Sequence, residues 1–234
     1  MQKTPASLSS ERLAAYTNVR WDIVELVPAE VGRVLDLGCS DGTLGRVLKE
    51  QRPDRHVVGV EYSADLAQRA VANLDQIIQT DLNRPDALDE LAGQQFDCVV
   101  CADVLEHLQH PWDLLARLRP MLAPGARLVI SLPNIRHVSA LGSIYLRGTF
   151  PRESRGIFDD THLRWFTLRD GRQLLGDAGF ATDKVVCSLR WGSKGGGRAN
   201  RLLNRLLGPV APRIAPVREF LTYQFALGAT FESA

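Results

Sequence analysis

The chain has 234 residues, 45% hydrophobic and 24% charged, which is the composition of an ordinary globular domain. The 28 Lys and Arg residues nearly balance 27 Asp and Glu residues, which excludes a surface that is basic throughout and gripping nucleic acid. The apolar runs are of strand length, no apolar leader is visible and four cysteines are too few for a disulfide framework, so we expect a cytoplasmic protein.

Short β-branched runs alternate with helical patterns along the first half of the chain. Strands are predicted at Arg33–Leu37, His56–Glu61, Gln76–Thr80, Phe96–Cys101 and Arg127–Leu132. The helices predicted between them are Thr43–Gln51, Ala64–Asn73 with Ser63 as its N-cap, and Pro111–Arg119. This alternation predicts an α/β fold, in which a parallel sheet carries helices on both faces.

The second half interrupts the alternation twice. Residues 134–166 are too many for a plain connection, and we expect them to form an insertion on the acceptor side. Residues 190–218 carry seven Lys or Arg and no Asp or Glu, which is typical of a solvated helix face or of contact with an anionic acceptor or membrane surface. We expect one domain over 1–234, with an N-terminal helix over 9–28. Its last elements are predicted as a capped helix at Thr167–Ala178 and strands at Lys184–Leu189 and Gln224–Thr230.

The loop after the first predicted strand has the composition of a ligand-binding turn. Gly38 and Gly42 lie between a strand and a helix, where a ligand can approach the backbone closely. Asp36 and Asp41 flank the turn, and two carboxylates would repel a pyrophosphate. The loop therefore predicts a ligand with a cationic end, such as an amino-acid ammonium beside a sulfonium.

Two further acids follow the next strands. Glu61 can accept hydrogen bonds from both hydroxyls of a ribose, and Asp81 could reach an adenine amino group. Together with the first loop they indicate a nucleoside that has an amino-acid tail and no phosphate. S-adenosylmethionine meets that description.

Taken in order, these motifs resemble the class I S-adenosylmethionine-dependent methyltransferases over roughly Trp21 to Val186. The segments 96–108 and 122–125 resemble the fourth-strand motif of that family and the turn before its fifth strand. The resemblance implies a Rossmann-like seven-stranded sheet whose last strand pair is antiparallel. Ser40 stands where the family usually has glycine, but it can still present its backbone N–H. The implied cofactor contacts are Asp36, Gly38, Cys39, Ser40, Asp41, Gly42, Glu61, Tyr62, Asp81, Leu82, Ala102 and Asp103.

Histidines are the natural candidates for the base, because methyl transfer to a hydroxyl requires removal of its proton. The resemblance places His107 near the bound cofactor. His162 lies in a block, 158–167, that resembles an Asp-x-Thr-His-Leu-Arg motif of small-molecule methyltransferases in glycan and lipid pathways. We interpret His162 and His107 as catalytic candidates, with Asp160 as a carboxylate partner; the alternative is that these residues only line the pocket or pin the lid.

Metal binding is the less favoured interpretation of one spacing. Asp103, Glu106, His107 and His110 could share a helical face, but Glu-His also occurs in relatives of the family that bind no metal, so no metal is expected. Cys98 and Cys101 are a poor metal pair, because residues three apart in a strand point to opposite faces.

The acceptor is the least determined part of the prediction. A small molecule is expected, most simply a hydroxyl of a sugar or lipid-linked glycan. The alternatives are another small molecule of quinone or amino-acid type, and a non-catalytic accessory protein similar to methionine-biosynthesis protein W. No base-clamping Asn-Pro-Pro-Tyr motif follows the fourth strand, so nucleic acid is not the expected substrate. The sequence leaves the oligomeric state open.

Overall fold

The computed structural model describes residues 18–190, 205 and 215–232. Its strands are β1 (Arg33–Leu37), β2 (His56–Glu61), β3 (Gln76–Gln79), β4 (Phe96–Ala102), β5 (Leu122–Pro133), β6 (Phe180–Leu189) and β7 (Thr222–Phe231). The helices are α2 (Trp21–Val24), α3 (Thr43–Gln51), α4 (Ala64–Ala70), α5 (Pro111–Leu118), α6 (Val138–Leu141), α7 (Leu168–Asp177) and α9 (Ala215–Leu221). Single turns of tighter or wider helix complete the set: η1 (Asp89–Leu91), η2 (Leu105–His107), η3 (Arg119–Met121) and η4 (Gly142–Leu146).

The seven strands form one sheet in the order β3-β2-β1-β4-β5-β7-β6. The pairs among β1 to β5 are parallel, whereas β7 runs antiparallel to both β5 and β6. The predicted Rossmann-like sheet with an antiparallel last pair is therefore confirmed. Its order reverses at β1 and β4, and in such sheets ligands bind beyond the carboxyl ends of the strands at this switch point.

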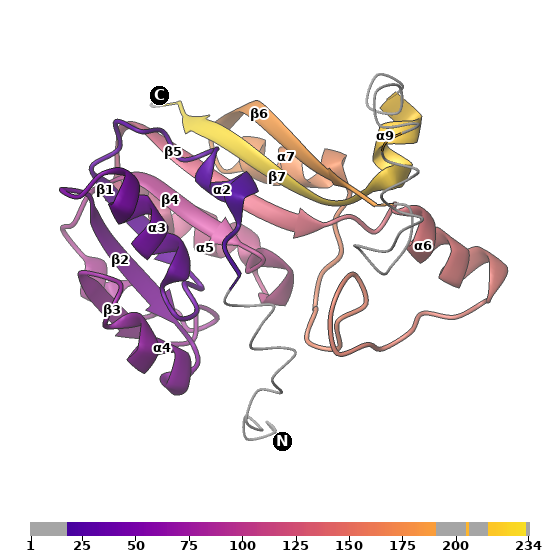
Figure 1. Cartoon of the computed structure of the whole chain (residues 1–234), viewed down its shortest axis with the longest axis horizontal. Coiled ribbons are helices and arrows are strands. Elements are labelled where there is room, and N and C mark those ends of the chain that lie inside the picture. The colour runs from indigo at the N-terminus through magenta and orange to yellow at the C-terminus, as the bar shows by residue number, and fades with distance from the viewer. Residues whose placement is uncertain (1–17, 191–204, 206–214, 233–234) are drawn as a thin grey trace.

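Apolar side chains bury both faces of the sheet, as parallel strands require. Leucines of α5 and α7 pack with the core on one face, and α2, α3 and α4 contribute to the core on the other. Cys101 belongs to the first core and Cys98 to the second, as the alternation of side chains along β4 predicts. Figure 1 shows helices on both sides of the twisted sheet.

Two caps fix the predicted helix starts. Ser63 accepts a hydrogen bond from the Leu66 N–H, and Thr167 forms a complete capping box with Asp170 before α7. The predicted turn at Pro124-Gly125 instead lies inside β5, where Gly125 has φ +71° and the register against β4 shifts. The strand therefore begins at Leu122, five residues earlier than the predicted start at Arg127, and it contains an irregular stretch at Pro124 and Gly125.

The predicted N-terminal helix is shorter than expected within the described residues. It covers only Trp21–Val24 and is followed by turns. Pro28 keeps the helix from continuing to residue 28, because a proline disfavours helical backbone in the residue before it, here Val27. Residues 9–17 of that prediction lie outside the described part of the chain, as does most of the basic stretch 190–218, including its predicted helix face.

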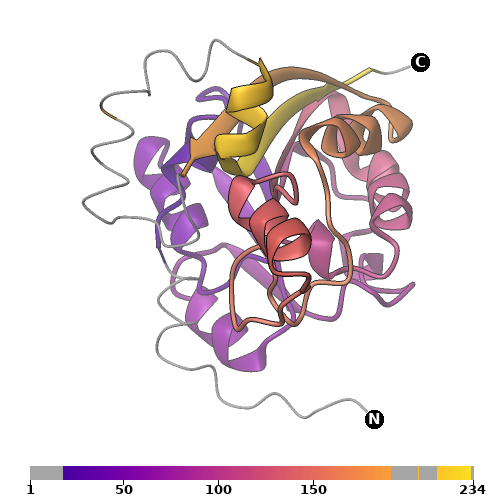
Figure 2. The ribbon, with the colours of Figure 1, turned by 90° about the vertical axis from the view of Figure 1, so that its right-hand side faces the viewer.

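The segment 134–166 forms one end of the molecule. It contains α6 and the wide turn η4, and two isolated bridges, Asn134 to Phe166 and Glu153 to Asp159, hold its path. Figures 1 and 2 show α6 close to α9 at this end, away from the β3 edge of the sheet. No helix among the described residues is both long and apolar enough to cross a membrane.

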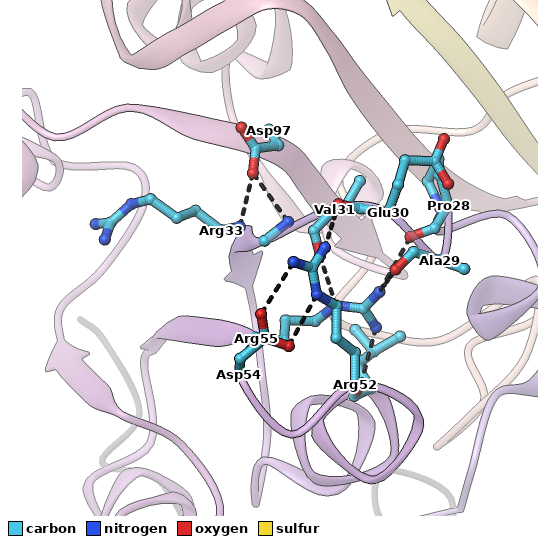
Figure 3. A network of polar contacts seen from close by, with 11 residues as sticks. Pro28, Ala29, Glu30, Val31, Arg33, Arg52, Asp54, Arg55 and Asp97 are labelled. Atoms are coloured by element: carbon cyan, nitrogen blue, oxygen red, sulfur yellow. Dashed lines mark hydrogen bonds and ion pairs between the residues drawn. The ribbon is translucent and has the colours of Figure 1, made fainter.

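A buried arginine closes the amino-terminal edge of the sheet. Arg55, 1% exposed, precedes β2 and donates four hydrogen bonds of 2.9–3.1 Å to backbone carbonyls, those of Pro28, Ala29, Val31 and Leu48 (Figure 3). Beside it, Asp97 accepts hydrogen bonds from the backbone N–H groups of Gly32 and Arg33 at 3.0 and 2.8 Å. The polar groups of Arg55 and Asp97 are therefore paired within the protein at the amino-terminal ends of the strands.

Candidate functional site

A cavity of about 650 Å³ opens at the carboxyl ends of β1, β2 and β4. Every predicted cofactor contact except Gly42 lines its walls. These residues are Asp36, Gly38, Cys39, Ser40, Asp41, Glu61, Tyr62, Asp81, Leu82, Ala102 and Asp103. His107 also lines the cavity. The sequence motifs are thus brought to one place, although direct contact of each residue with a cofactor stays a prediction.

The loop after β1 is shaped by residues with left-handed backbone. Gly38 has φ +73°, and a Cβ added there would lie 2.5 Å from Val104 Cγ2. Gly42 has φ +76° at the N-cap of α3, and an added Cβ would press on Asn73 and Leu74 at 3.0 Å. Gly42 therefore allows the loop to pack against Asn73 and Leu74, and it does not line the cavity itself. Ser40 adopts φ +53°, a conformation that favours the glycine usual at this position.

The carboxylate of Asp36 is buried, and one of its oxygens has no hydrogen-bond partner among the described residues. The side chain is 2% exposed, and this oxygen is Oδ2. Burial, aided by the negative charge of Glu61, raises the pKa of Asp36 to about 7. Ser40 Oγ, in the loop after β1, is also buried and has no hydrogen-bond partner within the described structure. A ligand with a positively charged end would stabilise the carboxylate form of Asp36.

Glu61, the last residue of β2, and Asp81, which follows β3, are held by the backbone around them. Glu61 accepts hydrogen bonds from the N–H groups of Ser40 and Ser63 at 2.9 and 2.8 Å, and burial raises its pKa against the effect of these bonds. Asp81 accepts from the Asn83 backbone N–H at 2.9 Å. Each carboxylate is therefore oriented before any ligand arrives, with Glu61 tied directly to the first loop.

Asp103 is fixed by three side chains from distant parts of the chain. It has φ +57°, accepts a hydrogen bond from Ser131 Oγ at 2.6 Å, and contacts the guanidinium of Arg20 and the amide of Gln224. Arg20 also lines the cavity. The sequence did not connect Arg20, Ser131 or Gln224 with Asp103, because no local pattern links residues so far apart in the chain.

His107 belongs to a hydrogen-bonded chain that ends at a buried carboxylate. Thr161 Oγ1 donates to Asp159 Oδ1 at 2.6 Å, so this hydroxyl is left to accept from His107 Nδ1, 3.1 Å away. The chain therefore assigns the ring proton to Nδ1 and the lone pair to Nε2. Asp159 is 6% exposed, which makes it the buried anchor of the chain.

His162 meets His107 across the cluster. The two imidazole rings lie edge to face with centroids 4.7 Å apart, and His162 Nδ1 donates to the Ile157 carbonyl at 3.2 Å. Burial, with the adjacent His107, lowers the pKa of His162 and favours the neutral ring. Backbone hydrogen bonds from Leu163 and Arg164 to the Glu106 carbonyl, of 2.8 and 3.0 Å, bring this block to η2.

Glu106 is the third member of this cluster. It is 1% exposed, and neither carboxylate oxygen has a hydrogen-bond partner among the described residues. Burial and the neighbouring charge of Asp103 raise its pKa well above the ordinary range. One donor atom each of Glu106, His107 and His162 lies within 4.8 Å of the others.

Two further candidates from the sequence are exposed. Asp160 lies at the surface, and the buried carboxylate that is linked to His107, through Thr161, is that of Asp159. His110 is exposed at the start of α5, outside the cluster of Glu106, His107 and His162. A turn reverses side-chain directions between adjacent residues, so sequence spacing alone could not choose between Asp159 and Asp160.

Comparison with known proteins gives a consistent result. The family model described as methyltransferase domain matches residues 11–185. A ubiquinone biosynthesis O-methyltransferase of Xylella fastidiosa is 34% identical over 127 residues, covering 52% of this chain and 50% of that protein. The counterpart from Xanthomonas campestris is 30% identical over 149 residues, 60% of this chain and 61% of its own. The chain thus matches only about half the length of the first of these relatives.

Solved structures share the fold over nearly the whole chain. A methyltransferase from Archaeoglobus fulgidus superposes with a TM-score of 0.61 at 19% identity, covering 93% of each chain. Magnesium protoporphyrin IX methyltransferase from Synechocystis, solved with bound SAH, gives 0.60 at 18% identity and covers 98% of this chain and 90% of its own. At these identities the likeness concerns the architecture.

Proposed function

This chain belongs to the methyltransferase domain family, and from that premise we propose that it transfers a methyl group from S-adenosylmethionine to a ring hydroxyl of a quinone-type small molecule. Membership agrees with the class I methyltransferase identity predicted from the sequence motifs. The single observation that carries the proposal is the cavity at the switch point, which is lined by Asp36 with its unsatisfied oxygen and by His107 of the histidine cluster. That arrangement offers a place for a cationic cofactor and for removal of a proton.

The residues present fit S-adenosylmethionine. Asp36 and Asp41 supply negative charge for the cationic end, and the unsatisfied oxygen of Asp36 lacks only such a partner. Glu61 would hold the ribose hydroxyls, and Asp81 with Leu82 the adenine. When bound, the cofactor supplies a methyl group that is already activated by its cationic sulfur.

The chain itself must orient the acceptor and receive its proton. As the acceptor oxygen bonds to carbon, the hydroxyl proton has to leave, and we assign its departure to the cluster of Glu106, His107 and His162. His107 is the member that lines the cavity, and Thr161 with Asp159 fixes the orientation of its ring. The lowered pKa of His162 keeps that ring neutral near pH 7.

A phenolic hydroxyl suits this cluster better than an alkyl hydroxyl. A phenol has a pKa of about 10, as in tyrosine, whereas water and simple alcohols ionise several units higher. A second cavity of about 360 Å³ lies in the acceptor-side segment and is lined by apolar side chains that include Leu146, Ile157 and Phe158. We propose that this cavity accommodates an apolar substituent of the ring. The names of the relatives, which concern ubiquinone biosynthesis and O-methylation, support the same class.

A methyl-transfer assay with defined acceptors tests the proposal. The full chain is incubated with labelled S-adenosylmethionine and either an alkyl-substituted catechol or a nucleotide sugar, and the products are analysed by mass spectrometry. We expect O-methylation of the catechol that is lost in Glu61→Ala and kept in Glu90→Ala, an exposed acid outside the cavity. Absence of catechol methylation by a chain that binds the cofactor would overturn the assigned acceptor class.

A sugar hydroxyl is the second candidate. The block 158–167 resembles a motif of glycan- and lipid-pathway methyltransferases, and Arg147 and Glu153 give the second cavity polar groups that could bind hydroxyls. Methylation of the nucleotide sugar in preference to the catechol would select this candidate.

A further inference from the structure

We propose that Glu106, His107 and His162 form a binding site for a divalent transition metal ion, with Zn²⁺ the best match to the donors. One donor atom from each side chain lies within 4.8 Å of the other two, although the residues come from two segments of the chain. A carboxylate with two imidazoles is a donor set that Zn²⁺ takes with a further position left for water or substrate. Mg²⁺ and Ca²⁺ prefer oxygen throughout, so nitrogen donors argue against them.

The first independent observation is the state of Glu106. Its side chain is 1% exposed, and both carboxylate oxygens lack hydrogen-bond partners among the described residues. Leaving a buried carboxylate without donors is costly, and proteins usually pair it or use it to coordinate a metal. The Arg20 guanidinium, whose positive charge acts on Glu106, is already bonded to Asp22 and Asp103. A cation between Glu106 and the imidazoles would satisfy this group.

The second observation concerns the far side of each imidazole. His107 Nδ1 donates to Thr161, whose hydroxyl is bonded to buried Asp159, and His162 Nδ1 donates to the Ile157 carbonyl. Both rings therefore carry their lone pair on Nε2. Histidines that bind metals characteristically donate the other ring N–H to a carbonyl, a carboxylate or a group bonded to one, because this fixes the tautomer and the ring plane.

The site also has a consequence for the reaction, and this part rests on the proposed function. His107 lines the cofactor cavity, so an ion in the cluster would lie at its wall. An acceptor hydroxyl that occupied the remaining coordination position would be held near the cofactor and would ionise at a lower pH. With the ion bound, the two histidines act as ligands, the hydroxyl proton is released to water in the cavity, and the cluster promotes its departure through the ion.

Cobalt spectroscopy reports the site without reference to activity. The tag-free full chain is stripped with a chelator and titrated with Co²⁺, and the visible d–d absorption of the ion is recorded. We expect saturation at one Co²⁺ per chain and reversal by added Zn²⁺. Glu106→Gln and His162→Gln should each weaken Co²⁺ binding by about tenfold or more, and Thr161→Val, which removes a supporting hydrogen bond, by about tenfold. His110→Gln, an exposed histidine outside the cluster, is the matched control and should bind as the parent does.

Calorimetry with S-adenosylmethionine on the same samples separates the two proposals. A chain that binds the cofactor but gives no d–d absorption, or whose absorption survives His162→Gln, overturns the metal site and leaves the proposed function standing. Cobalt absorption without any cofactor binding would do the reverse. A variant that binds the cofactor normally is folded, so a loss of Co²⁺ binding in it reports the site alone.

Discussion

The two ends of the central strands differ in how their buried polar groups are satisfied. At the amino-terminal ends, Arg55 is buried and uses its donors on four backbone carbonyls, and Asp97 accepts two backbone N–H groups (Figure 3). At the carboxyl ends, Asp36, Ser40 and Glu106 have buried oxygens for which the described part of the chain supplies no hydrogen-bond partner. One edge is thus complete in itself, whereas the other is complete only with a ligand.

Backbone conformation follows the same division. Ser40 and Asp103, the non-glycine residues with positive φ in the described structure, both lie at the cavity. Strain of this kind persists where the surroundings impose it, and it gathers at functional sites. The comparison therefore teaches that in this fold the unsatisfied edge, rather than the well-bonded one, identifies the place of chemistry.

The largest expected effect is on stability and follows from removing the buried Arg55 at the amino-terminal ends of the strands. Arg55→Met should lower the free energy of unfolding by about 3–5 kcal/mol, because the carbonyls lose a buried charged donor. Arg52→Met, which removes an exposed arginine bonded mainly to Asp54, should change it by less than about 1 kcal/mol. Urea denaturation followed by circular dichroism measures both. Equal effects of the two substitutions would show that burial of Arg55 is not the stabilising feature.

At the cavity, Glu61→Ala should weaken S-adenosylmethionine binding by about 100-fold, since two charge-assisted hydrogen bonds to the ribose are lost. Glu90→Ala should leave binding unchanged. Isothermal titration calorimetry gives the ratio directly. Binding by Glu61→Ala within about threefold of the parent would remove Glu61 from the ribose site.

The pKa of Asp36 makes the unsatisfied edge sensitive to pH. Because that pKa is about 7 in the fold and near 4 in an unfolded chain, folding binds a proton between these values. The Asp36 contribution to stability is therefore full below about pH 4 and is lost as the pH rises towards 7. A cationic ligand favours the carboxylate, so cofactor affinity should rise by up to about tenfold per pH unit until about pH 7 and then level off.

Calorimetric titrations between pH 5.5 and 8 check this dependence, with Asp36→Asn as the comparison. The substituted chain should bind more weakly and lose the rise below pH 7. A rise that persists unchanged in Asp36→Asn would assign it to another group.

The smallest expected effect concerns the left-handed residues. Ser40→Gly should raise the free energy of unfolding by about 0.5–1 kcal/mol, because glycine adopts φ +53° without strain and removes a buried unpaired hydroxyl. Asp103→Gly relieves the same strain but loses the bonds to Arg20, Ser131 and Gln224, so it should destabilise. In urea denaturation, the free energy of unfolding should rise for Ser40→Gly and fall for Asp103→Gly. A fall for both variants would contradict the strain assigned to the positive φ of Ser40.

Much of the sheet could be predicted because its strands are short, β-branched and bounded by turns. The acids after β1, β2 and β3 could be predicted as a group, since carboxyl ends of parallel strands meet at one edge. Of the predicted N-terminal helix, only Trp21–Val24 is helical among the described residues, and Pro28 bars its continuation beyond Val27. The antiparallel arrangement of β6 and β7 came only from the family resemblance.

The parts of the site that could not be predicted depend on long-range contacts. His162 reaches His107 only because backbone bonds to Glu106 draw the 158–167 block against η2. Arg20 reaches Asp103 from a segment 83 positions earlier. Residue spacing along the chain predicts neither contact. The helical spacing therefore suggested His110 as a neighbour of Glu106, whereas the structure places His162 there.

The most direct test is calorimetric titration of S-adenosylmethionine into the unsubstituted 234-residue chain at pH 7.5. We expect saturable heat with one cofactor per chain, and competition by S-adenosylhomocysteine for the same site. A chain whose circular dichroism shows it folded, yet which gives no binding heat at several temperatures and is not stabilised by the cofactor in thermal unfolding, would contradict this prediction.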